Sequence, residues 1–136
     1  MKVKVGLLIV LLTLILGCHQ TKPDNNAEVK KEMIKVTVLY ANGEGKMFDM
    51  DYYTNKHFPL LKRLFRSAMK TTAIDKGVGS GTPGTPVPYL AIGYLYFENL
   101  ADYEDGLKGG HLEEILADIP KYTNITPVIQ ISEVIQ

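Results

Sequence analysis

A histidine, His57, lies in the segment DMDYYTNKHFPLLKRL, which spans residues 49–64. The pKa of a free imidazole lies near neutrality, so His57 could act as a general base or a general acid. Tyr53 lies one helical turn earlier and could hydrogen-bond or orient the ring, and Asp49 could do the same. The alternative is a structural histidine that the backbone or Asp49 satisfies beside Pro59.

Tyr94, Tyr96 and His111 are candidates for contact with a ligand. Tyr94 and Tyr96 alternate within YLAIGYLYF, residues 89–97, so they share one side of a strand. Aromatic side chains in a loosely packed interior can hold small apolar molecules, and core packing is their alternative role. His111 follows two glycines and would begin a helix, where simple exposure to solvent is the alternative.

Composition and spacing argue against several other kinds of site. The chain has 136 residues and a formal net charge of zero, so it lacks the basic surface that nucleic acids require. No cysteine and histidine have the close spacing of a zinc site, so we expect no metal. Residues 77–88, GVGSGTPGTPVP, match neither the dinucleotide fingerprint nor the P-loop, and we expect no cofactor.

The amino-terminal segment has the pattern of a targeting signal. Residues 1–4 are cationic, and residues 5–16 are almost purely apolar, a length typical of a signal-peptide core. The sequence ILGC that ends at Cys18 resembles the bacterial lipobox. The resemblance implies a lipoprotein signal peptide over residues 1–17 and a lipid on Cys18, with a free cysteine in an uncleaved anchor as the alternative.

The residues after Cys18 predict how the protein is held in the cell envelope. Residues 18–32 are polar and aperiodic, and we expect a disordered tether. His19 stands where an aspartate would favour the inner membrane, which indicates the outer membrane, facing the periplasm. The folded domain is then expected to span residues 33–136.

Periodicity predicts the elements that must position the candidate side chains. Strands are predicted over residues 34–40, 71–78, 89–97 and 126–135. Helices are predicted from Asp49 or Asp51 to Leu64, and over residues 98–116 with an interruption at two glycines. Pro59 lacks an N–H group and disfavours helical geometry at Phe58, so we expect the first helix to kink or break there.

This order of elements predicts an α+β protein, a ferredoxin-like βαββαβ sandwich. Two helices cover only one face of a four-stranded sheet. The strand over residues 89–97 is nevertheless apolar on both sides, so its second side must also be buried. A homodimer that packs sheet against sheet, a dimeric α/β barrel, would bury that side.

The segments IKVTVLYANGEGKMFDMDYYTNKHFPLLKRL, GSGTPGTPVPYLAIGYLYF and DIPKYTNITPVIQISEV together resemble the EthD family, named for ethyl tert-butyl ether degradation. The resemblance runs from about Met33 to the end of the chain and implies a small dimeric α+β barrel. The family's Tyr-x-x-x-His-x-Pro-Leu segment is matched by Tyr53, His57, Pro59 and Leu60.

The resemblance leaves two classes of function open. Related barrels include cyclases, isomerases and decarboxylases, which implies a cofactor-independent enzyme that binds a small apolar organic molecule and uses His57. The founding member is an auxiliary protein, which implies a non-catalytic binding or accessory module of a degradation or oxidoreductase system. Fold sharing alone does not separate these classes.

Overall fold

The structure is a computed structural model that describes residues 27–136. The expected signal peptide and Cys18 lie outside the described residues. Within the described part of the chain, no helix combines the length and the apolar character needed to cross a membrane. Residues 27–30 have no regular structure, and the amide of Glu32 donates to the carbonyl oxygen of Val134 at 2.7 Å.

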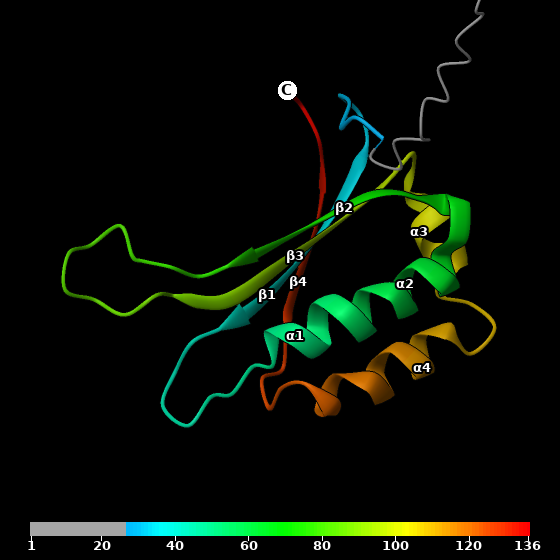
Figure 1. Cartoon of the computed structure of the whole chain (residues 1–136). Coiled ribbons are helices and arrows are strands. Elements are labelled where there is room, and N and C mark those ends of the chain that lie inside the picture. The colour runs from blue at the N-terminus through cyan, green and yellow to red at the C-terminus, as the bar shows by residue number, and fades with distance from the viewer. Residues whose placement is uncertain (1–26) are drawn as a thin grey trace, which may run out of the picture.

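Four strands and four α-helices make up the described domain (Figure 1). The strands are β1 (Ile34–Ala41), β2 (Met69–Lys76), β3 (Tyr89–Phe97) and β4 (Val128–Glu133). The α-helices are α1 (Met50–Tyr52), α2 (Phe58–Phe65), α3 (Leu100–Gly106) and α4 (His111–Asp118). A π-helical turn (Tyr53–His57) joins α1 to α2, and short 3-10 helices follow α2 (Arg66–Ala68) and α4 (Ile119–Lys121).

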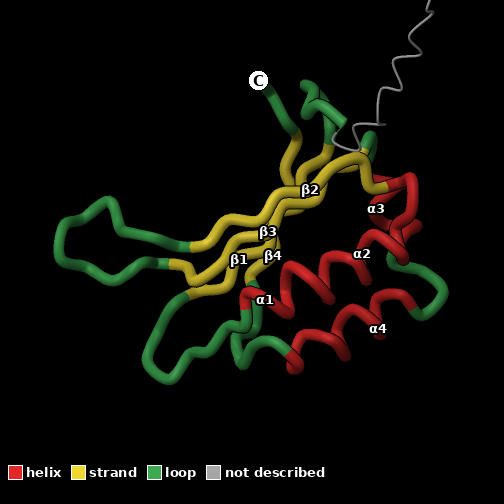
Figure 2. The backbone as a smooth tube through the Cα atoms, viewed as in Figure 1, coloured by secondary structure: helices red, strands yellow, loops and turns green. Residues whose placement is uncertain are grey.

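The strands form one sheet in the order β2-β3-β1-β4, and each neighbouring pair is antiparallel. The helices lie on one side of this sheet (Figure 2). This arrangement confirms the predicted ferredoxin-like α+β fold. The glycine- and proline-rich residues 77–88 form the long loop between β2 and β3, which projects away from the body of the domain (Figure 1).

Alternation along β3 decides which side chains face the helices. Ala91, Leu95 and Phe97 are buried on the helix side, where Leu95 lies opposite Val36 of β1. Side chains of intervening residues lie on the outer face of the sheet and are half-buried; they are Ile92, Tyr94 and Tyr96. Leu90 lies at a register shift between β1 and β3 and packs against the core. β3 therefore has one face in the core of the domain and an apolar face directed away from it.

The helix side of β3 contains a glycine because an aromatic side chain lies directly on the backbone. A Cβ atom at Gly93 would collide with the hydroxyl of Tyr53 and touch the ring of Phe58. The rings of Tyr53 and Phe58 meet edge to face with centroids 5.0 Å apart. The absence of a side chain at Gly93 thus allows the helices and the sheet to approach closely.

The helix does not break at Pro59, so the break, one of the two alternatives predicted from the sequence, is wrong; the irregularity at this point is a π turn directly before α2. Phe58 keeps helical geometry, with φ −64° and ψ −40°, and its N–H donates to the carbonyl of Tyr53. This i→i−5 bond defines the π turn directly before the proline. Pro59 then lies in the first turn of α2, directly after the π turn, so helical geometry continues past a residue that has no N–H to donate.

Candidate functional site

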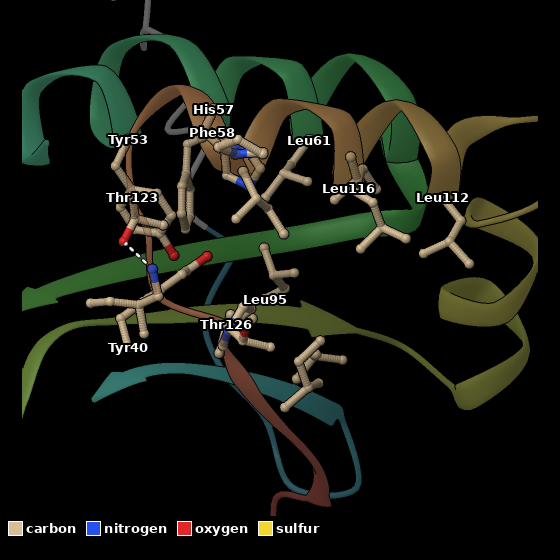
Figure 3. A pocket seen from close by; sticks show the side chains of 18 of the residues that line it. Tyr40, Tyr53, His57, Phe58, Leu61, Leu95, Leu112, Leu116, Thr123 and Thr126 are labelled. Carbon is tan, nitrogen blue, oxygen red and sulfur yellow. Dashed lines mark hydrogen bonds between the residues drawn. The ribbon is translucent and has the colours of Figure 1, made fainter. Parts of the chain in front are cut away.

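A cavity of about 500 Å³ lies between the helices and the sheet (Figure 3). This volume falls within the usual range for pockets that enclose one small organic molecule. The walls are mostly apolar and come from β1, β3, β4, α2, α3 and α4. They include Phe58, Leu61, Leu95, Leu112, Leu116 and Ile129. His57 and Tyr53 also line this cavity, so the π turn places both side chains in its wall.

The ring of His57 is held by a carboxylate from the opposite helix. Nδ1 of His57 lies 2.8 Å from Oδ2 of Asp118, the last residue of α4. His57 is 4% exposed and Asp118 is 5% exposed. An ionised carboxylate only accepts hydrogen bonds, so the shared proton belongs to Nδ1, and Nε2 keeps its lone pair.

Two further groups donate to the other oxygen of Asp118. The hydroxyl of Tyr52 lies 3.0 Å from Oδ1, and Nζ of Lys121 lies 3.1 Å from the same atom. Burial on its own raises the pKa of Asp118, but the hydrogen bonds from His57, Lys121 and Tyr52 outweigh it and hold this pKa below its ordinary value. Asp118 is therefore an ionised and fully bonded partner for His57.

Burial lowers the pKa of His57, although Asp118 acts in the opposite direction. The ring is therefore neutral at neutral pH, which leaves Nε2 able to accept a proton. Burial also raises the pKa of Tyr122 and Tyr53, so both remain neutral hydroxyl donors. A neutral imidazole beside an ionised carboxylate is the arrangement that supports general-base chemistry.

Tyrosine rings surround the other faces of His57. The ring of Tyr53 stacks on the imidazole at a centroid distance of 5.5 Å and an angle of 13°. The hydroxyl of Tyr122 lies 3.4 Å from Nε2, and it lies 2.7 Å from the hydroxyl of Tyr40. The hydrogen bond at Nε2 is long, so a ligand that makes a shorter bond can replace it.

The structure brings only some of the predicted site residues together. His57 and Tyr53 are in contact, as the helical spacing suggested. Asp49 caps α1 instead, because its carboxylate accepts from the amide of Tyr52 at 2.9 Å. Asp118 therefore has the orienting role that we had considered for Asp49.

Tyr94, Tyr96 and His111 lie away from the cavity wall. The two tyrosines are on the outer face of β3, opposite to the face that Leu95 presents to the cavity. His111 begins α4, as predicted, and its Nδ1 donates to the carbonyl oxygen of Gly106 at 2.9 Å. Among the described residues, no group of three or more His, Cys, Asp or Glu side chains could hold a metal ion.

Sequence reasoning missed Asp118, Tyr122 and Tyr40. A signal for Asp118 was present, because it follows Ile115 at helical spacing and so shares the apolar side of that helix. A carboxylate on the buried side of a helix indicates a buried partner. Tyr40 and Tyr122 carried no such signal, since apolar packing explains both positions equally well.

The fold and site define a ferredoxin-like α+β protein with an apolar cavity. His57 lies in the wall of this cavity, and its partner Asp118 lies behind the wall. The chain belongs to the EthD domain family, whose model matches residues 43–126. No curated protein matches the chain.

Solved structures give further likenesses. The chain is 36% identical to an EthD-like protein from Ralstonia eutropha JMP134, over 79% of this chain and 96% of that one, with a TM-score of 0.73. An EthD family protein from Bacillus halodurans C-125 is 19% identical, over 74% and 97%, with a TM-score of 0.58. A dimeric ferredoxin-like protein of unknown function from Thermobifida fusca YX is 12% identical, over 80% and 97%, with a TM-score of 0.50.

Proposed function

We propose that the cavity binds a small, largely apolar organic molecule and that His57 transfers a proton to or from it. The observation that carries this proposal is the 2.8 Å hydrogen bond between Nδ1 of His57 and Asp118, made by a histidine in the cavity wall. Since Nδ1 is occupied, Nε2 is the atom that would meet the ligand. The reaction class is a cofactor-independent cyclisation, isomerisation or decarboxylation.

The proton balance of such a step needs no further reactant. Nε2 accepts a proton from a carbon next to a ligand carbonyl, and the electron pair moves to the carbonyl oxygen. The resulting imidazolium is stabilised by the carboxylate of Asp118. Return of the proton to another atom of the ligand completes an isomerisation and restores the neutral ring.

Hydrogen–deuterium exchange tests the proton transfer without knowledge of the natural product. Ligands that copurify with the protein are identified by native mass spectrometry, and the exchange of their C–H protons in D₂O is followed by NMR. We expect His57→Gln to slow exchange by about a hundredfold to ten-thousandfold. His111→Gln is the matched control, because His111 lies outside the cavity wall. Unchanged exchange in a folded His57→Gln variant would refute the catalytic role.

A non-catalytic binding or accessory module is the second candidate. It is favoured by the burial of His57 and by the contacts of both ring nitrogens, to Asp118 and Tyr122, which a structural histidine also makes. In that case ligands bind to the protein, no exchange exceeds the rate in buffer, and His57→Gln retains the bound ligand. Loss of folding on the same substitution would point to the structural role as well.

The outer face of the sheet supports a homodimer. Half-buried apolar side chains cover it on β3, among them Ile92 and Tyr94, and Leu39 of β1 lies opposite Ile92. A second copy packed sheet against sheet would form the dimeric barrel and bury these residues. We expect light scattering to give the mass of two chains, and Ile92→Lys to give monomers. A monomeric unmodified chain would overturn the dimer.

An anchor at Cys18 would place this domain at a membrane surface in the cell envelope, facing the periplasm from the outer membrane. The support is the lipobox-like sequence alone, since Cys18 lies outside the described residues. Intact mass spectrometry of the membrane fraction is expected to show a chain that begins at Cys18 and carries acyl groups. Cys18→Ala should remove the acyl mass, and an unprocessed chain in the unmodified protein would contradict the anchor.

A further inference from the structure

The two ends of the cavity differ in chemistry. Tyr40, Tyr53, His57 and Thr123 lie at one side in Figure 3, and Leu112 and Leu116 lie at the other. Leu61 and Leu95 lie between these two groups. Tyr103 adds one hydroxyl from α3, where its ring packs against Phe65 and Phe97. Thr126, which lies beside Leu95 in Figure 3, and Asn124 are the remaining polar residues of the described wall. Four of the seven wall residues with hydrogen-bonding side chains therefore lie on the His57 side of the cavity, namely Tyr40, Tyr53, His57 and Thr123.

The wall carries no formal charge in the part of the chain that the structure describes. Its residues include no Asp, Glu, Lys or Arg. Asp118 is the nearest carboxylate to the ring of His57, and its oxygens are already bonded to His57, Tyr52 and Lys121. A charged ligand group would lose its hydration without gaining a counter-ion, which is strongly unfavourable. An uncharged ligand avoids this penalty.

The cavity opens to solvent between α4 and β4. Leu112, Leu116 and Ile129 line the cavity and yet are 41%, 53% and 53% exposed. Leu112 and Leu116 come from α4, and Ile129 comes from β4. These three side chains define an apolar mouth. Since exposed apolar area costs free energy in water, an aliphatic chain that leaves through the mouth would gain by covering them.

We infer that the ligand is an elongated, uncharged molecule with one hydrogen-bonding head group and an aliphatic tail. The head group, such as a ketone or an alcohol, lies against His57. The tail passes Leu61 and Leu95 and emerges at the apolar mouth. This inference rests on the proposed function, because it specifies which apolar molecule the same cavity binds. An uncharged ligand restricts the proposed reaction to a cyclisation or an isomerisation, since decarboxylation requires a carboxylate on the ligand.

The ligand series that tests this shape uses the purified full chain and calorimetry. The linear set is 2-hexanone, 2-octanone, 2-decanone and 2-dodecanone. The compact set is cyclooctanone and 2-decalone, and the charged set is hexanoate, octanoate and decanoate. We expect affinity to rise by about fourfold for each added methylene of the linear ketones until the tail is outside the protein. The cyclic ketones and the carboxylates of equal carbon number should bind at least about tenfold more weakly.

A substitution at the apolar mouth tests the position of the tail. Leu116→Asp is expected to flatten the dependence of affinity on chain length across the linear ketones, because the mouth no longer offers an apolar surface to the tail. Leu100→Asp is the matched control, because Leu100 is 42% exposed but does not line the cavity. If Leu116→Asp does not fold, the ligand series on the unmodified chain still decides the question.

The outcomes separate this inference from the proposed function. Cyclic ketones or carboxylates that bind as tightly as linear ketones would overturn the elongated, uncharged ligand and leave an apolar binding site in place. An equal effect of the two aspartate substitutions would overturn the path of the tail. If neither linear nor cyclic ketones bind, the proposed function fails together with the inference.

Discussion

Nδ1 of His57 and Oδ2 of Asp118 lie 2.8 Å apart, although 61 residues separate them in the sequence. Each residue satisfies a polar group that would otherwise be buried without a partner. The hydrogen bond also connects α4 to the π turn before α2.

Asp118→Asn should lower the pKa of His57 further, because the carboxylate raises this pKa against the effect of burial. We expect the free energy of unfolding to fall by about 1–3 kcal/mol, because the buried hydrogen bond of His57 loses its charged acceptor. NMR titration of the His57 ring and urea denaturation measure the two effects. Glu113→Gln, on the exposed side of α4, is the control. An unchanged or raised pKa of His57 would contradict the assignment of Asp118 as its partner.

Tyr52→Phe should raise the pKa of Asp118, because the hydroxyl of Tyr52 donates to Oδ1 of the ionised carboxylate. Lys121→Met should act in the same direction, because it removes a cation from the same oxygen. Carbon-13 NMR of the labelled carboxyl group follows each titration. The double variant should give the larger shift. No shift in either variant would show that His57 alone keeps Asp118 ionised.

The free energy of unfolding should fall as pH decreases below about 6.5, the ordinary pKa of histidine. Burial lowers the pKa of His57 in the folded state, so the unfolded chain binds a proton first, and protonation favours unfolding until the folded pKa is passed. The lowered pKa of Asp118 adds a second loss below its ordinary value of 3.8. Urea denaturation at several pH values measures both losses.

His57→Gln should remove the first of these two losses, because the variant has no imidazole at this position. His111→Gln serves as the control and should retain the loss below pH 6.5. A free energy of unfolding of the unmodified protein that does not decrease as the pH falls below about 6.5 would contradict the lowered pKa of His57.

Gly93→Ala should destabilise the protein by about 1–3 kcal/mol, because the new Cβ atom collides with the hydroxyl of Tyr53. Displacement of Tyr53 should also alter the NMR shifts of the His57 ring, on which Tyr53 stacks. Gly79→Ala is the control, since a Cβ there meets no atom within 4 Å.

Removal of the Tyr53 hydroxyl should relieve its collision with the new Cβ atom in the Gly93→Ala variant. Gly93→Ala combined with Tyr53→Phe is therefore expected to be less destabilised than the sum of the two single variants. Urea denaturation of all four proteins gives this coupling. Strict additivity would mean that the alanine acts through some contact other than Tyr53.

The strands were the most predictable part of the fold, because alternation is a local property of the sequence. β3 has the predicted bounds of residues 89–97, and β1 extends by one residue to Ala41. A kink or a break was predicted at Pro59, and the break is wrong, because the rule for proline considers an α-helix and not a π turn. Tyr53, the first residue of the π turn, packs against the sheet at Gly93, a contact that no local pattern reveals.

The site was less predictable than the fold. His57 and Tyr53 are close in sequence, so helical spacing placed them together. Asp118 comes from a distant helix, and only the packing of α4 beside α2 brings it to His57. The sequence could not predict which face of the sheet carries Tyr94. β3 is apolar on both sides, and alternation does not tell which side the helices cover.

One short helix supplies both the side chains at the opening of the cavity and the carboxylate that binds the ring of His57. Leu112, Leu116 and Asp118 all belong to α4, which follows Gly109 and Gly110 with left-handed φ values of 68° and 86°. A helix of this length moves as a rigid body. A displacement of the whole helix away from α2 would both widen the opening and lengthen the hydrogen bond between Asp118 and His57. Under the proposed function, the entry of a ligand and the orientation of the His57 ring would therefore depend on the position of the same helix.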